Sequence, residues 1–202
     1  KILDLDNPDI TDKILDAIEA ADLDPDQTEK LEHEFKKEIH IMTAPQRLQS
    51  VAKDFVSHYS DLWTSGKAMF GCLNKVTCVR MYNLVQDYWK EEIKRLEGIK
   101  SKVSQQEAQE LERKIKWMKE TEMAVVISQE QNEIQTFKKW NLDIKPHREK
   151  MEKRELDKEF KDKDNPLRVV FVCAMWLTGF DVKCLSCLYL DKPLKAHTLM
   201  QT

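Results

Sequence analysis

The hydrophobic positions of this chain change their spacing along its length. Around residues 44–56 apolar side chains recur every three or four positions, which predicts a helix that starts near Pro45. Further along, apolar residues form short continuous runs bounded by turn signals. Such runs are typical of strands buried on both faces of a parallel sheet. The runs that fit this description are residues 67–73, 123–127, 168–173 and 187–190.

Helical segments separate the predicted strands. Residues 76–96 predict a long helix that Gly98 ends, and residues 101–120 predict a second, highly charged helix. We expect this pair to form a hairpin that projects from the sheet with a solvated outer face. Shorter helices are expected up to Trp140 and at 155–161. Strands that alternate with helices indicate right-handed crossovers, so the predicted fold class is α/β with a parallel sheet.

The first 43 residues are acidic and predict short helices interrupted at Asp24-Pro25. We therefore divide the chain into a helical connector, residues 1–43, and a main domain, residues 44–202. An Asp-x-Asp-x-Asp run at 22–26 has the spacing of a calcium loop, but it lacks the required Gly and Glu, so no calcium is expected. Because the chain starts with Lys1 and stops where a further helix is predicted to open, we expect it to be a piece of a longer protein.

Composition narrows the function classes. The 202 residues are 41% hydrophobic and 34% charged with a net charge of −3, so nucleic-acid binding requires a local basic face. Five cysteines are an odd number, and buried free thiols of a cytoplasmic protein fit best. Cys184 and Cys187 are too few for a structural zinc site, so we interpret them as core thiols and expect no metal. We expect no signal peptide, and the given sequence has no apolar run long enough for a membrane span.

The turn from Thr178 to Asp181, sequence TGFD, lies after the third predicted strand, where open α/β sheets bind ligands. Thr178 offers a hydroxyl to a phosphate, Gly179 allows close approach of the backbone, and Asp181 can accept from a ribose hydroxyl. The alternative is an ordinary turn in which the aspartate caps a backbone group. Because the chain lacks GxxxxGK[ST], we expect that it does not by itself cradle a triphosphate in the usual way. It also lacks the HExxH motif of metalloproteases and the GxSxG motif of serine hydrolases.

Three stretches carry a resemblance to a known family. They are AMFGCLNKVTCVRMYN (68–83), EMAVVISQEQNEIQTFKKW (122–140) and LRVVFVCAMWLTGFDVKCLSCLYLDKPLKAHTLMQ (167–201). They resemble the second motor domain of superfamily 2 helicases and translocases, and most closely the restriction subunit of type I restriction-modification enzymes. The resemblance covers roughly residues 44–202. It implies a RecA-like parallel sheet flanked by helices, with a helical hairpin inserted at about 76–120.

The resemblance also implies an activity. Such a subunit belongs to an ATP-dependent type I site-specific deoxyribonuclease that translocates double-stranded DNA alongside modification and specificity subunits. Gly179 and Asp181 would face the nucleotide, and Gln201 would open a motif whose arginines lie beyond Thr202. ATP and Mg would be bound mainly by the other motor domain, and the nuclease residues lie outside this chain. The fragment alone is therefore expected to be inactive.

Further residues are implied to face DNA. By the resemblance these are Asn74, Lys75, Ser128, Gln129 and Thr178. We add a hypothesis that the Lys/Arg-rich segment 145–158 contacts the DNA backbone. One departure from the family pattern is Lys183, where the family usually has Pro.

Two alternatives remain open at this point. The chain could belong to another superfamily 2 ATPase, of the type III restriction or remodelling kind. It could also be a non-catalytic RecA-like module in which residues 1–40 and the 76–120 hairpin dock partner subunits.

Overall fold

The computed structural model describes residue 37, residues 39–177 and residues 179–192. The chain divides into two units, residues 1–47 and residues 48–202, and the second unit contains the sheet. Most of the predicted helical connector lies outside the described residues, although residues 39–42 are helical. The proposed boundary at residue 43 therefore stays a prediction. Within the described part of the chain, no helix is long and apolar enough to cross a membrane.

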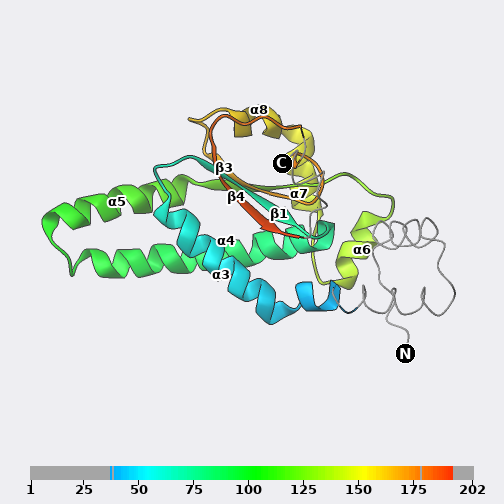
Figure 1. The fold of residues 1–202 in the computed structure, drawn as a ribbon, viewed down its shortest axis with the longest axis horizontal. Helices are drawn as coiled ribbons and strands as arrows, with labels where there is room; N and C mark the ends of the chain where they lie inside the picture. Colours follow the sequence, from blue (N-terminus) through cyan, green and yellow to red (C-terminus); the bar gives the residue numbers. More distant parts are fainter. Residues whose placement is uncertain (1–36, 38, 178, 193–202) are drawn as a thin grey trace. The chain divides into compact units, whose positions relative to one another are not determined.

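All four predicted strands are present, and all of them are parallel. They are β1 (Lys67–Cys72), β2 (Glu122–Val126), β3 (Leu167–Val172) and β4 (Leu185–Asp191). The strand order is β2-β3-β1-β4, so the two central strands are β3 and β1. This confirms the predicted α/β class with a helix-flanked parallel sheet, and the arrangement is consistent with a RecA-like fold (Figure 1).

Helices cover the sheet on both faces (Figure 1). They are α3 (Pro45–Asp61), α4 (Lys75–Lys100), α5 (Gln105–Glu120), α6 (Glu133–Lys139), α7 (Lys145–Lys153) and α8 (Leu156–Lys161). On one face Phe70 and Phe171 of the central strands pack against Phe55 of α3, with ring centroids 5.1 to 6.4 Å apart. On the other face Met69 and Phe160 belong to a second buried cluster. Strands β1, β2 and β3 are thus buried on both sides, as their continuous apolar runs predict, whereas the edge strand β4 is only partly buried and Leu188 is exposed.

Helices α4 and α5 form the predicted hairpin, which extends beyond the sheet (Figure 1). Its inner face is held by buried side chains and by the Trp89 indole, which donates to the Met118 carbonyl at 2.9 Å. The prediction that Gly98 ends the first helix was wrong, because α4 continues to Lys100. Packing against α5 offsets the roughly 1 kcal/mol that a helical glycine costs. Ser104 and Glu107 then start α5 with a reciprocal capping box.

The sequence pattern predicts no helix at α7, which lies in a polar segment. This helix lacks an apolar stripe, and His147 is its buried residue. Polar contacts hold it on the sheet instead: the Lys150 ammonium donates to the Met123 carbonyl of β2 at 2.9 Å. Helix α8 occupies residues 156–161 and confirms the short helix predicted at 155–161.

Two glycines are expected to respond oppositely to alanine. Gly98→Ala should raise the free energy of unfolding by about 0.5–1 kcal/mol, because the helix gains propensity and nothing lies within 4 Å of the new Cβ. Gly66→Ala should lower it by more than about 1 kcal/mol. Gly66 has a φ of +147°, and a Cβ there would lie 2.5 Å from the Cys184 carbonyl oxygen.

Urea unfolding of the chain and of both variants provides the measurement. A destabilised Gly98→Ala variant would contradict the continuous helix through residue 98, and a stable Gly66→Ala variant would contradict the close approach to Cys184.

Candidate functional site

The carboxyl ends of the four strands meet at one edge of the sheet, because all four strands are parallel. Most predicted site residues follow these ends directly or lie in the loop that leaves β3. The predicted residues within the described part are Asn74, Lys75, Ser128, Gln129, Gly179 and Asp181. Thr178 and Gln201 lie outside the described residues.

Asn74 and Lys75 begin helix α4 at the end of β1. The Asn74 side-chain oxygen accepts a hydrogen bond from the Thr77 backbone at 2.8 Å and caps the helix. The Lys75 side chain is largely buried and forms a short ion pair with Glu130. Glu130 follows β2, and β3 lies between β2 and β1 in the sheet. The pair therefore links the start of α4, which follows β1, to the loop after β2, although β1 and β2 are not neighbours in the sheet.

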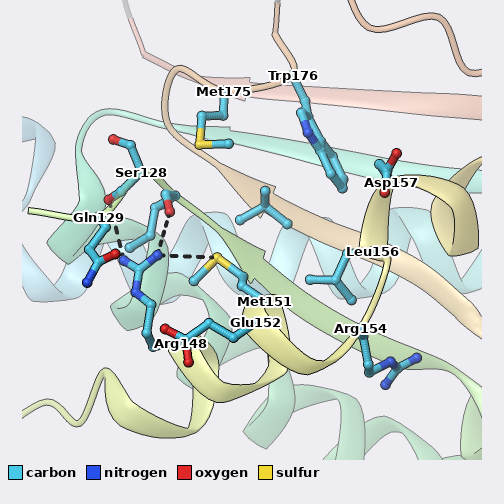
Figure 2. Close-up of a pocket in the computed structure, with 12 residues that line it drawn as sticks. Ser128, Gln129, Arg148, Met151, Glu152, Arg154, Leu156, Asp157, Met175 and Trp176 are labelled. Carbon is cyan, nitrogen blue, oxygen red and sulfur yellow. Dashed lines mark hydrogen bonds between the residues drawn. The ribbon is translucent and has the colours of Figure 1, made fainter.

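Arg148 of α7 fixes the carboxyl end of β2 (Figure 2). Its guanidinium pairs with the Glu133 carboxylate through two contacts of 2.9 and 2.7 Å. It also donates to the backbone carbonyls of Ile127 at 3.1 Å and Ser128 at 3.4 Å. Because Arg148 binds both the Glu133 side chain and the backbone at the end of β2, it stabilises the loop that carries Ser128 and Gln129.

Other cations of the 145–158 segment also serve the fold. Arg154 pairs with Glu159 and, at 2.6 Å, with Glu122, and these hydrogen bonds raise the pKa of its guanidinium. Lys150 reaches the β2 backbone, as described above. The hypothesis that this segment contacts DNA then depends on its exposed lysines. Of these, Lys153 and Lys158 form exposed pairs with Glu149 and Glu155.

His147 of the same segment is not a cation at neutral pH. Burial, with a smaller contribution from the Lys150 charge, lowers the pKa of His147 from 6.5 to about 4, and Asp143 opposes this only in part. The imidazole packs edge-on against Tyr82 with ring centroids 4.7 Å apart. Its place is in the packing between α4 and α7.

A hollow of about 420 Å³ opens beside the end of β2 (Figure 2). Its apolar lining comes from Val126, Ile127, Met151, Leu156, Met175 and Trp176. Its polar lining comes from Ser128, Gln129, Arg148, Glu152, Arg154 and Asp157. Both arginines are paired with carboxylates, and two further carboxylates lie on the rim. This charge balance does not favour a phosphate. Among the described residues no group of three or more His, Cys, Asp or Glu could hold a metal ion.

The loop between β3 and β4 carries the two described residues predicted to face a nucleotide. Gly179 is exposed, has a φ of +71°, and has no atom within 4 Å of the position of a Cβ. Asp181 is exposed as well. The loop is anchored by the buried side chains of Leu177 and Val182. Gly179 and Asp181 do not line the hollow, so the residues predicted for nucleotide and for DNA are not gathered in one pocket.

The cysteine prediction can be assessed directly. Cys184 is partly buried, with its thiol 3.6 Å from the carbonyls of Phe160 and Lys161. Cys187 is buried in the cluster on the opposite face of the sheet. The two thiols are free and belong to clusters on opposite faces of the sheet.

Sequence reasoning missed the partners of the site. Glu130, Glu133 and Arg148 are brought to the carboxyl edge by tertiary packing. The sequence spacing of these residues does not predict the pairs Lys75–Glu130 and Arg148–Glu133. Trp176 was missed for a similar reason, because its stacking on Phe160 and Phe180 exists only in the folded chain.

Residues 64–202 match the family described as type I restriction enzyme subunit R domain 3. A putative type I restriction enzyme MjaIXP endonuclease subunit of Methanocaldococcus jannaschii is 31% identical over 181 residues, which cover 88% of this chain and 14% of that protein. The type I restriction enzyme HindI endonuclease subunit of Haemophilus influenzae is 58% identical over 52 residues, covering 26% of this chain and 5% of that protein.

The two relatives therefore resemble this chain in different ways, one along most of its length and one in a short, closely similar stretch. The chain spans about one seventh, or less, of the length of these relatives. A second Methanocaldococcus jannaschii protein, a putative type I restriction enzyme MjaVIIP endonuclease subunit, is 30% identical over 178 residues, covering 85% of this chain and 14% of that protein.

The buried His147 predicts a pH dependence of stability. Because its pKa is lower in the folded chain, the unfolded chain takes up a proton first, and the free energy of unfolding falls as pH drops from 6.5 towards 4. His147→Gln removes this proton uptake. The variant should lose less stability than the wild type over this window, by up to about 3 kcal/mol.

Urea unfolding at several pH values checks this, with His58→Gln as the control at an exposed histidine. Parallel pH profiles for wild type and His147→Gln would show that the imidazole is not held neutral in the fold.

Proposed function

Because the chain belongs to the family of type I restriction enzyme R subunits, we propose that it forms part of the ATP-dependent DNA-translocating motor of such an enzyme. The match of residues 64–202 to domain 3 of these subunits carries the proposal. The parallel sheet supports it, since its loops converge at one edge where α/β proteins bind ligands. The family assignment favours a type I enzyme over the type III and remodelling alternatives. A partner-docking module without catalytic function is the alternative that the experiments below must separate.

The nucleotide side of this motor is assigned to Gly179 and Asp181, together with Gln201. Two features of the loop support this. The left-handed φ of Gly179 and the open space around it leave the backbone accessible to a ligand. The exposed Asp181 takes part in no hydrogen bond or ion pair with the described residues, so its carboxylate is available to a ribose hydroxyl. ATP and Mg would be held mainly by another domain of the parent protein.

The DNA side is assigned to the carboxyl edge, with Asn74, Lys75, Ser128, Gln129 and Thr178. Contacts of such residues with phosphates and sugars would position double-stranded DNA without reading its sequence. Sequence choice and methylation then belong to specificity and modification subunits, and the complex works in the cytoplasm. Lys75 can reach a phosphate only by leaving Glu130, because its ammonium is largely buried in that pair. Release of Glu130 is therefore part of the proposed DNA contact.

The first test is DNA-stimulated ATP hydrolysis by the full-length parent subunit with its partner subunits. Asp181→Ala should lower kcat/KM for ATP by about tenfold or more, because a contact to the nucleotide is lost. Asp164→Ala serves as the control, since Asp164 is an exposed aspartate in the turn before β3. Circular dichroism verifies that both variants are folded.

Unchanged turnover in Asp181→Ala would move the nucleotide site away from this loop. A wild-type complex without any ATP hydrolysis would favour the partner-docking module.

The second test concerns Lys75. If its ammonium contacts a phosphate, Lys75→Gln should weaken DNA binding and reduce the slope of log K against log salt by about 1. Glu130→Gln should strengthen binding, because it releases Lys75 from its ion pair. Lys116→Gln is the control, at an exposed lysine of the α5 helix. Titrations of the full-length subunit with duplex DNA at several salt concentrations measure all three. A slope unchanged by Lys75→Gln would leave the Lys75–Glu130 pair with a structural role alone.

A further inference from the structure

Trp176 has an unusual backbone conformation. Its φ of +68° lies in the left-handed region, which bulky side chains rarely adopt. Such a conformation persists where the surroundings determine it more strongly than the local preference, and it clusters at functional segments. The residue lies in the loop that leaves β3, three positions before Gly179. The contacts of its side chain explain how the conformation is held.

The Trp176 indole is the middle ring of a three-ring stack. Phe160 of α8 lies on one side, with ring centroids 6.0 Å apart and an interplanar angle of 22°. Phe180 lies closer, with centroids 4.3 Å apart and an angle of 12°. The Lys161 ammonium lies 4.5 Å from the centroid of the Phe180 ring. Because two near-parallel rings pack against it, the indole is not an open platform for a base, and its role lies within the protein.

One end of this stack is fixed in the core. Phe160 is fully buried, and the neighbouring Glu159 carbonyl accepts a hydrogen bond of 2.8 Å from the buried Lys67 ammonium of β1. The other end, Phe180, is the residue between Gly179 and Asp181. Both of these neighbours are exposed, and nothing packs against the position of a Gly179 Cβ. Between the buried Leu177 and Val182, the aromatic stack and the Lys161 ammonium over Phe180 therefore tie this part of the loop to α8.

We propose that Trp176 is a positioning residue, which holds Gly179 and Asp181 in place by stacking between Phe160 and Phe180. This inference rests on the proposed function of the loop in nucleotide binding. Asp181 itself would touch the nucleotide, and Trp176 acts through it. A displacement of about 1 Å at a positioned group can cost about a hundredfold in rate, so the stack has a measurable consequence.

The test uses Trp176→Asn in the full-length subunit. Asparagine tolerates the left-handed conformation but removes the stacked ring, so it separates stacking from backbone strain. Trp176→Phe keeps a ring and should restore most of the function. Trp140→Asn is the matched control, because Trp140 is an exposed tryptophan in the connection between α6 and α7. Asp181→Ala is measured beside them.

Two readouts are combined. Hydrogen exchange followed by mass spectrometry should show faster exchange of the backbone amides from Gly179 to Val182 in Trp176→Asn only. DNA-stimulated ATP hydrolysis should show kcat/KM for ATP lowered by about tenfold to a hundredfold in the same variant, mainly through KM. The melting temperature reports whether the whole fold is intact.

The outcomes separate the two proposals. Unchanged exchange in Trp176→Asn would overturn the positioning role. Faster exchange with normal ATP kinetics, while Asp181→Ala is impaired, would overturn it too, because the position of Asp181 would not depend on the stack. Faster exchange with normal kinetics in both Trp176→Asn and Asp181→Ala would support the stack as the anchor of the loop and overturn the nucleotide assignment instead.

Discussion

The constraint on which this fold depends is that a parallel sheet with helices on both sides has no face left for water. The inner strands must be apolar on both sides, and each connection to the next strand must pass over a face of the sheet. On one face the cover comes from long amphipathic helices, and Phe55, Phe70 and Phe171 interlock there. On the other face the cover is short and rich in charge. Buried Phe160 and Leu156 supply its apolar contacts, and polar groups must supply the rest.

Those polar groups are tolerated because they are paired. Burying an ammonium or guanidinium costs several kcal/mol unless hydrogen bonds replace its water. Lys67 and Lys150 donate to backbone carbonyls, and Arg148 and Arg154 donate to carboxylates. Within the described part of the chain, every buried side-chain nitrogen and oxygen atom has a hydrogen-bond partner. Specific hydrogen bonds therefore help to hold the short helices α7 and α8 on the sheet. Helices α3 and α4 are held mainly by the apolar surface that they bury.

This difference decides how much the sequence could predict. Apolar runs located all four strands, and helical periodicity located α3, α4 and α5, because burial leaves a period in the sequence. Helix α7 shows no apolar period, since His147 is its one buried residue within the described chain and its polar contacts reach residues that are distant in the sequence. The prediction that Gly98 ends a helix failed for a different reason. The low helix propensity of glycine was outweighed by packing within the hairpin. At the candidate site, the sequence indicated the glycine and aspartate of the β3–β4 loop. It could not indicate the pairing of Lys75 with Glu130 or the stack of Trp176, which exist only in the folded chain.

The same pairing limits how the proposed motor can hold DNA. A cation that holds a helix in place through an ion pair cannot bind a phosphate without releasing its partner. The carboxylates around the hollow also disfavour a phosphate there. The proposed DNA contact at the carboxyl edge must therefore come from exposed side chains such as Gln129, or from an exchange of partners at Lys75. The proposed nucleotide loop is held by a different device, an aromatic stack on α8. Helix α8 begins beside the hollow and ends beside Phe180, and Trp176 both lines the hollow and stacks on Phe180, so the hollow and the proposed nucleotide loop share these two supports.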